Sequence, residues 1–331
     1  MDSRPEFLFC FTADTEPDDL WANRPGLSFE HFSRLPEFHT RICSAGARPT
    51  YLTTSEVAES KVARRALENC RERHPCEIGV HFHTWTREWP FPVPDLGTPR
   101  LHAMAHRLGP HIEEAMLSYS CDALRRSFRT EPHAYRGGRW SLGPGSEQSL
   151  RKCGITVDST VTPGIDWRDS KHVFLSGPNW TKACRYPHML SDVFDNPIAS
   201  NGVLEIPVGS AWFPRAAQEY GGFAKRQLAR VGKLTGLRLG HRWLRPTGVS
   251  LPDMIATMKS LRAGGVPVWV FMIHSSEISP CKPLPSQGDV DAFVSRCENV
   301  VAAAVELGAK PATLSEAAAA VRETTSIRHR A

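Results

Sequence analysis

Two histidines end an apolar segment near residue 80 and could bind one metal ion together. The segment reads EIGVHFHTW, so His81 and His83 are two positions apart. Side chains alternate between the two faces of a β-strand, and both imidazoles would therefore point the same way. Two imidazoles on one face at the end of a strand are the beginning of a metal site. A surface or packing role for both histidines is the alternative.

Carboxylates follow the first apolar segment of the chain. Phe7–Ala13 reads FLFCFTA, which has the length of a strand, and it leads into the acidic segment DTEPDD. Asp14 and Glu16 share a face if the strand continues through them, and Pro17 would end it. Taken alone, an acidic segment that contains proline is more typical of a solvated turn.

A third apolar segment, Pro267–His274 (PVWVFMIH), also ends in a histidine. Taken alone, His274 is more typical of a structural residue or a helix cap. In parallel α/β folds, however, the groups that carry out chemistry collect at the C-terminal ends of the strands. Carboxylates after one strand and imidazoles after two others therefore predict a common site.

Two arginines and two glycines lie together in the segment YRGGRW. Arg136 or Arg139 can pair with a carboxylate and fix its charge state, and the glycines let the backbone approach a ligand closely. Trp85, Trp89 and Trp140 lie in or beside the expected site loops. Their rings could stack on the C–H faces of a sugar, although tryptophan also packs well in a core.

Strand-like and helix-like segments alternate along the chain. The expected strands are Phe7–Ala13, Pro49–Thr53, Glu77–His83, Ala134–Arg136, Thr156–Thr160, Val203–Val208 and Pro267–His274. The expected helices are Ser55–Arg73, Leu101–Phe128, Ser146–Cys153, Leu251–Ala263 and Asp289–Leu307. This alternation predicts parallel βαβ units that close into a barrel. A doubly wound sheet is the alternative, but no GxGxxG motif follows a first strand.

Three segments are typical of loops. Thr86–Pro99 contains four prolines and is expected to form a rim loop after the histidine strand, and Val161–Pro178 is a second loop. Gly209–Pro246 is the largest insertion, and it is basic. No domain boundary is evident, so residues 1–331 are expected to form a single barrel domain with an insertion at about 209–246.

Composition predicts a globular cytoplasmic protein. The 331 residues are 41% hydrophobic and 23% charged, and no segment approaches the ~20 apolar residues of a membrane span. The N-terminus reads as a first strand instead of a signal peptide, and nine scattered cysteines predict reduced thiols.

The net charge of +5 is modest, and much of the excess lies in Lys225–Arg245. This basic run could contact an anionic substrate or a membrane surface peripherally. A solvated basic face is the alternative, and the more typical one. No nucleic-acid-binding motif accompanies it.

In their order and spacing, these motifs resemble the polysaccharide deacetylases, carbohydrate esterase family 4, with the NodB-like homology fold. Asp14-Thr15-Glu16 resembles the first motif of the family, the YRGGR segment its arginine motif, and Ile273-His274 its last motif. The second motif usually reads His-Ser/Thr-x-x-His. Here the second histidine is His83 and Trp85 follows, which resembles the His-x-His-x-Trp branch.

Two further segments extend the resemblance from Phe7 to about Ala318. The segment LRKCGITVDSTVTP, at 150–163, resembles the leucine-rich helix, glycine and Asp-Ser-Ser of the family. The segment KPATLSEAA, at 310–318, resembles its closing segment.

The resemblance implies a deformed (β/α)7-type barrel and metal-dependent removal of an N-acetyl group from an amino sugar. It implies that Asp14 is the general base, that His274 is the general acid, and that Arg136 orients Asp14. Trp85, Trp89, Arg139 and Trp140 are the residues that we expect to bind the sugar.

The resemblance also implies a divalent metal, typically Zn²⁺. His81, His83 and Glu16 would be its ligands, and Asp18 and Asp19 compete with Glu16 for the carboxylate position. Three protein ligands leave positions open for water and substrate.

The expected substrate is an N-acetylated sugar in a glycan or glycoconjugate, with lipid-linked and nucleotide-linked sugars among the candidates. Two alternatives stay open. One is hydrolysis of another C–N or ester bond on the same scaffold, and the other is a non-catalytic carbohydrate-binding protein. A serine hydrolase has no basis in the sequence, because no GxSxG motif is present.

Overall fold

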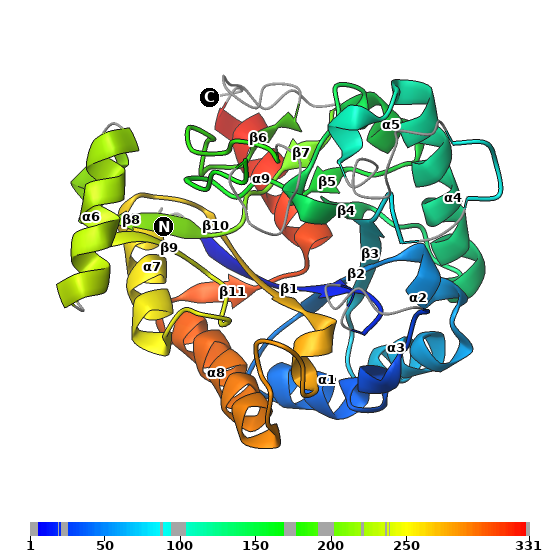
Figure 1. The fold of residues 1–331 in the computed structure, drawn as a ribbon, viewed down its shortest axis with the longest axis horizontal. Coiled ribbons are helices and arrows are strands. Elements are labelled where there is room, and N and C mark those ends of the chain that lie inside the picture. The colour runs from blue at the N-terminus through cyan, green and yellow to red at the C-terminus, as the bar shows by residue number, and fades with distance from the viewer. Residues whose placement is uncertain are drawn as a thin grey trace.

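The computed structural model describes residues 6–18, 20, 26–86, 89–93, 104–168, 177–190, 202–219, 222–235, 237 and 239–328. Within them, a path of seven parallel strands curls into a deformed barrel with helices outside it (Figure 1). In spatial order these strands are β10 (Val268–His274), β1 (Phe7–Thr15), β2 (Pro49–Thr53), β3 (Glu77–Phe82), β4 (Ala134–Gly137), β5 (Val157–Asp158) and β7 (Leu204–Glu205). The expected deformed barrel of parallel strands is confirmed.

A single bridge joins the two ends of this path. Val208 follows β7 and pairs with Val270 of β10 in a parallel bridge, and the N–H of Gly209 donates to the carbonyl oxygen of Val270 at 2.9 Å. Two further strands extend the sheet: β6 (His188–Met189) lies antiparallel to β7, and β11 (Ala309–Pro311) lies parallel to β1.

Most of the described helices lie outside the sheet. The α-helices are α1 (Leu35–Ser44), α2 (Ser55–Glu59), α3 (Lys61–Arg73), α4 (Pro110–Phe128), α5 (Ser146–Lys152), α6 (Gly222–Thr235), α7 (Leu251–Ala263), α8 (Gln287–Glu306) and α9 (Leu314–Arg328). Short 3₁₀ helices lie at Glu30–Ser33, Ala105–Arg107, Gly138–Trp140, Arg215–Glu219 and Ser275–Ile278. No described helix is both long enough and apolar enough to cross a bilayer.

The strands alternate between two buried apolar clusters, as a two-residue side-chain period requires. Phe9 and Phe11 of β1 belong to the larger cluster, which includes residues of α1, α3, α4, α7 and α8. Leu8 and Cys10 belong to a second cluster, formed by residues of β2, β4, β5, β7, β10 and α9. The first cluster therefore lies between sheet and outer helices, and the second fills the inside of the barrel.

Several expected bounds differ from the structure for local reasons. The predicted helix Ser55–Arg73 is interrupted at Ser60, whose hydroxyl accepts a hydrogen bond from the N–H of Ala63 and so caps α3. The predicted helix Leu101–Phe128 becomes α4, which starts at Pro110 directly after Gly109; proline is favoured at this first helical position. Residues 101–103 lie outside the described residues.

The insertion Gly209–Pro246 contains structure that the sequence did not indicate. β8 (Ser210–Phe213) and β9 (Gly240–Trp243) pair antiparallel in a separate sheet, and α6 lies between them in the chain. We call the part of the chain from β8 to β9 the arm. α1 and α9 were also not predicted.

A buried histidine on α1 should make the fold sensitive to acid. His39 is fully buried; its Nε2–H donates to the carbonyl oxygen of His74 at 3.2 Å, so Nδ1 accepts from the hydroxyl of Tyr51 at 2.9 Å. Burial lowers the pKa of His39 from 6.5 to about 4. Between these pH values, the unfolded chain therefore binds a proton at His39 that the folded chain does not bind. The free energy of unfolding falls as pH falls through this window.

We expect the variant His39→Gln, whose side chain cannot bind a proton, to lose less stability as pH falls. Its free energy of unfolding should depend on pH as though about one proton fewer were taken up between pH 6.5 and 4. Urea unfolding across this range measures the slope. The exposed His111 on α4 offers a matched control, in which His111→Gln replaces an exposed histidine instead of a buried one. An unchanged slope in His39→Gln would contradict this prediction.

Candidate active site

The polar residues of the site continue the inner face of the barrel beyond its apolar layer. Asp14 lies four positions after Cys10, and Arg136 two positions after Ala134, both of the inner cluster. His81 lies two positions after Gly79, where an added Cβ would come within 2.6 Å of the Ala134 carbonyl oxygen. Strand alternation therefore directs these side chains inward at the C-terminal ends of their strands.

Strand register brings the site residues side by side across the sheet. Asp14 of β1 is aligned with His274 of β10, and His81 of β3 is aligned with Arg136 of β4. Glu16 follows β1 and is also buried. Five residues from four separate parts of the sequence thus meet at one end of the barrel.

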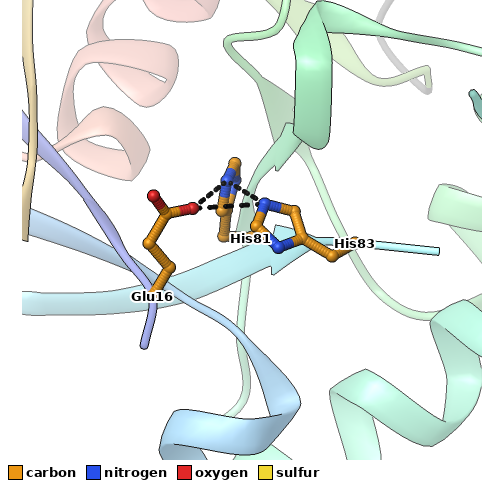
Figure 2. Close-up of side chains that lie close together, drawn as sticks. All are labelled: Glu16, His81 and His83. Atoms are coloured by element: carbon orange, nitrogen blue, oxygen red, sulfur yellow. Dashed lines mark hydrogen bonds and ion pairs between the residues drawn. The ribbon is translucent and has the colours of Figure 1, made fainter. Parts of the chain in front are cut away.

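Glu16, His81 and His83 converge on one point, as Figure 2 shows. The two Nε2 atoms are 2.9 Å apart, and Oε2 of Glu16 lies 3.7 Å from Nε2 of His81 and 3.3 Å from Nε2 of His83. All three side chains are buried. Of the carboxylates considered from the sequence, Glu16 is therefore the one that the described structure places with the histidines.

These three atoms fit a tetrahedral zinc ion. Zinc binds nitrogen and carboxylate oxygen at about 2.0–2.2 Å, which puts neighbouring ligand atoms roughly 3.3 Å apart. The observed separations, from 2.9 to 3.7 Å, lie around that value. Two imidazoles and one carboxylate are also a donor set that catalytic zinc sites use, with further positions left for water and substrate.

The histidines are in the protonation state that metal binding needs. Nδ1 of His81 donates to the carbonyl oxygen of Arg136 at 3.0 Å, so its Nε2 carries a lone pair. Burial lowers the pKa of His81, and it lowers the pKa of His83 well below the usual range. Both rings are therefore neutral near pH 7.

Asp14 has one oxygen held by an arginine and the other directed at the histidines. Oδ1 accepts from Nη1 of Arg136 at 2.6 Å, whereas Oδ2 lies 4.0 Å from Nε2 of His81 and 3.9 Å from Nε2 of His274. Burial alone would raise the pKa of Asp14, but the charge and the hydrogen bond of Arg136 help to outweigh it, and that pKa is lowered. Asp14 is therefore an ionised carboxylate, ready to accept a proton.

Arg136 is itself fixed by Ser159, which belongs to the segment that resembles the Asp-Ser-Ser of the family; the sequence did not indicate this contact. Arg136 is fully buried. Its Nε donates to the carbonyl oxygen of Ser159 at 2.7 Å and its Nη2 to the hydroxyl of Ser159 at 3.1 Å. With Nη1 on Asp14, these bonds hold the guanidinium plane in one orientation.

Arg245 contacts His274, and the sequence did not indicate this contact either. Nη2 of Arg245 lies 2.9 Å from Nδ1 of His274 and 3.1 Å from Oε1 of Glu277. Arginine can only donate, so Nδ1 accepts and the ring proton of neutral His274 lies on Nε2. Burial and the charge of Arg245 lower the pKa of His274 to about 4. His274 is thus a neutral Nε2–H donor near pH 7.

A buried hydrogen-bond chain holds the backbone of Glu16. Asp18 accepts from Nδ1 of His31, and Nε2 of His31 lies 2.9 Å from the hydroxyl of Ser275, which in turn lies 3.3 Å from the N–H of Glu16. His31 and Ser275 are buried, so this Ser–His–Asp arrangement positions Glu16 and offers no accessible nucleophile. Asp18 is thereby engaged away from the metal ligands, and Asp19 lies outside the described residues.

Trp85 and Arg139 cover His83, one of the candidate metal ligands. The rings of Trp85 and His83 stack with centroids 4.3 Å apart, and the guanidinium of Arg139 lies 4.5 Å from the Trp85 centroid. Gly138 is required here, because an added Cβ would lie 2.4 Å from a ring carbon of His83. Trp85 thus supports the site by holding a histidine ring.

The other two predicted sugar-binding tryptophans point into packed surroundings. Trp89 packs near Phe82, Phe91 and Tyr119, and its Nε1 donates to the carbonyl oxygen of Thr84 at 3.2 Å. Trp140 is only 8% exposed. It has a left-handed φ of 58°, directly after Arg139 with a φ of 54°; such consecutive outliers often cluster at functional sites.

Two half-buried tryptophans extend from Trp140 towards solvent. Trp167 stacks on Trp140 with centroids 5.8 Å apart, and Trp243 of β9 lies 5.9 Å from Trp140 and 6.0 Å from Trp167. The guanidinium of Arg245 lies 5.5 Å from the Trp243 centroid. Trp167 and Trp243, which the sequence analysis did not single out, therefore form an aromatic cluster with Trp140, and Arg245 links this cluster to His274.

Comparison with known proteins supports the fold. The sequence matches no protein-family model and no curated protein. Among solved structures, the chain is similar to a Mycobacterium smegmatis protein assigned as a polysaccharide deacetylase, with 16% identity, a TM-score of 0.50, and 98% of this chain and 93% of that chain covered.

Two other similar structures are enzymes of different activities. One is a family 4 carbohydrate esterase from Streptomyces lividans, solved with acetate (10% identity, TM-score 0.44, 94% of each chain covered). The other is a 4-alpha-glucanotransferase from Thermococcus litoralis (12% identity, TM-score 0.52, 95% of this chain and 40% of that chain covered). The chain therefore has the fold of the polysaccharide deacetylases, and the activity has to be argued from the site.

Proposed function

We propose that this protein is a metal-dependent hydrolase that removes the acetyl group from an N-acetylated amino sugar. The observation that carries the proposal is the convergence of Glu16, His81 and His83 directly beside Asp14 and His274. A hydrolase of amides needs an activated water, a base that takes its proton, and donors for the developing charge. The inner face of the barrel brings such groups together.

Zn²⁺ is the metal that we propose, held by Glu16, His81 and His83. When bound, a divalent ion there polarises the acetyl carbonyl and makes water more acidic. Asp14, fixed by Arg136, takes a proton from the attacking water through Oδ2. The oxygen of this water bonds to the acetyl carbon, and the carbon–nitrogen bond breaks. One proton of the water reaches the nitrogen and the other stays on the carboxyl group, so the products are a free amine and acetic acid, which ionises to acetate.

The residues around this centre support an amino sugar as substrate. Half-buried Trp167 and Trp243 lie next to each other, and Arg245 contacts both Trp243 and His274. Tryptophan faces stack on pyranose rings. Trp85, Trp89, Arg139 and Trp140 stay in the proposal as residues that shape this surface. The positive arm supports an anionic carrier, such as a lipid- or nucleotide-linked phosphate, on the sugar.

Acetate release tests the proposal. Protein loaded with Zn²⁺ should release acetate from N-acetylglucosamine oligomers or from UDP-N-acetylglucosamine, and chelation should stop the release. Asp14→Asn serves as the matched inactive control. O-acetylated xylan and maltooligosaccharides test the other chemistries: release from the ester alone, or glucan transfer without acetate, would contradict an N-deacetylase.

A further inference from the structure

The arm carries a helix, α6, that packs along one side on another segment of the arm. α6 packs on the segment leading into β9 through Gly232, where an added Cβ would lie 2.7 Å from the carbonyl oxygen of Leu239. Figure 1 shows α6 at the left edge of the molecule, beside the β8–β9 hairpin. Most of the described α6 side chains are exposed or half-buried.

Large apolar side chains are exposed on this helix and just after it. Val231, Leu234 and Leu237 are 45%, 86% and 59% exposed. They are three of the seven exposed large apolar side chains in the described part of the chain, and they lie within seven positions. Val231 and Leu234 are three positions apart, so they are neighbours on the helix surface. Scattered exposed side chains are ordinary, but a group on one element marks a contact surface.

The same stretch is purely basic. No acidic residue lies between Glu219 and Asp253 in the sequence, whereas seven basic residues do: Lys225, Arg226, Arg230, Lys233, Arg238, Arg242 and Arg245. Leucine beside lysine and arginine on a short helix is the composition of helices that lie in the interface of a bilayer. There the apolar side chains enter the acyl boundary and the cations meet anionic headgroups.

We infer that α6 and the turn after it bind the surface of a membrane that contains anionic lipids. A second copy of this chain is a poorer partner. The segment between Glu219 and Asp253 contains no acidic residue, so two such arms would bring like charges together. A nucleic acid would satisfy the cations but would leave the exposed leucines in water. An anionic bilayer satisfies both features.

The arm leads directly to the candidate active site. Arg245, whose Nη2 contacts Nδ1 of His274 at 2.9 Å, lies five positions after Gly240, at the start of β9. That stretch spans at most about 18 Å. A membrane-bound arm would therefore hold the site close to the headgroups. Access of the site to a lipid-linked sugar rests on the proposed function, whereas the membrane binding does not.

Vesicle flotation of the full chain tests the inference. Phosphatidylcholine vesicles are compared with and without phosphatidylglycerol, at low and at high salt. We expect binding to the anionic vesicles that weakens with salt, because headgroup charges are screened. Absence of binding, or equal binding to neutral vesicles, would overturn the inference. A concentration-dependent dimer in place of vesicle binding would assign the face to a second copy and overturn it as well.

Matched variants locate the surface. Leu234→Ser with Leu237→Ser should lower the partition coefficient at least about tenfold, and Arg230→Gln should lower it less. Val62→Ser is the control, because Val62 is 63% exposed and lies between basic residues on α3; its binding should be unchanged. Equal loss in the control would overturn the assignment to α6. Circular dichroism checks that each variant is folded, and acetate release from a soluble sugar measures the proposed activity separately. Vesicle binding can therefore be observed even if the proposed activity is absent.

Discussion

Replacing His83 with alanine should remove a bound zinc ion while leaving the protein folded. Purified protein should carry about one divalent ion per chain, because three converging ligand atoms at these separations suit one ion. His83→Ala leaves Glu16 and His81, and a site with two protein ligands loses most of its affinity. His81→Ala should do the same, and it also frees the carbonyl oxygen of Arg136. Metal analysis after dialysis, with Zn²⁺ titration of the apoprotein, measures both effects.

The exposed His111 on α4 provides the matched control for zinc binding. His111→Ala should keep the full zinc content, whereas Glu16→Gln should lose it, because the amide removes the charged ligand. Retention of stoichiometric zinc by the double variant of His81 and His83 would place the metal elsewhere. Loss of zinc from Glu16→Gln but not from Asp18→Asn would establish which carboxylate is the ligand.

The strands and the polar residues at their ends could be predicted because short patterns in the local sequence specify them. A short apolar run flanked by polar residues specifies a buried strand. The bounds expected for Pro49–Thr53 and Leu251–Ala263 are those of β2 and α7. The two-residue period then places His81 and His83 on one side, and the convergence of parallel strand ends brings Asp14 and His274 towards them.

The roles of Arg245, Trp85 and Trp140 depend on tertiary contacts that no local pattern encodes. Arg245 lies in a basic insertion, where the sequence gives no reason to distinguish it from the other arginines. Trp140 is turned inward by two consecutive left-handed residues, and such a conformation has no signal outside glycine and asparagine. Trp85 lies against His83 only because Gly138 lets the β4 turn approach.

Replacing Asp14 with asparagine should abolish acetate release while largely keeping zinc and fold. Asparagine is nearly isosteric, but its amide cannot take the proton of the attacking water. Arg136 would keep its two bonds to Ser159, so the surroundings stay ordered. Steady-state rates with zinc content measured on the same sample provide the test. Loss of zinc together with activity would make Asp14 a metal ligand, and a near-normal rate would show that another group is the base.

His274 is the residue where the structure refines the prediction most. A general acid has to be protonated before it donates, yet the pKa of about 4 leaves the ring neutral at pH 7. If His274 is nonetheless the acid, His274→Ala should lower turnover roughly 10²–10⁴-fold and no other side chain should replace it. If it only donates a hydrogen bond through Nε2, then Asp14 must return the proton that it took from water to the leaving nitrogen.

The variant His274→Gln separates these two roles, because a glutamine amide can donate a hydrogen bond near the position of Nε2 but cannot give up a proton. We expect His274→Gln to recover at least about tenfold in kcat over His274→Ala, since one well-placed donor to a developing charge contributes about 2.7–4 kcal/mol. Equal rates for the two variants would establish His274 as the acid. Recovery would instead assign both proton transfers to Asp14 and a hydrogen-bonding role to His274. The contact of Arg245 with Nδ1 is consistent with that role, because a cation at Nδ1 keeps the ring proton of His274 on Nε2, directed towards Asp14.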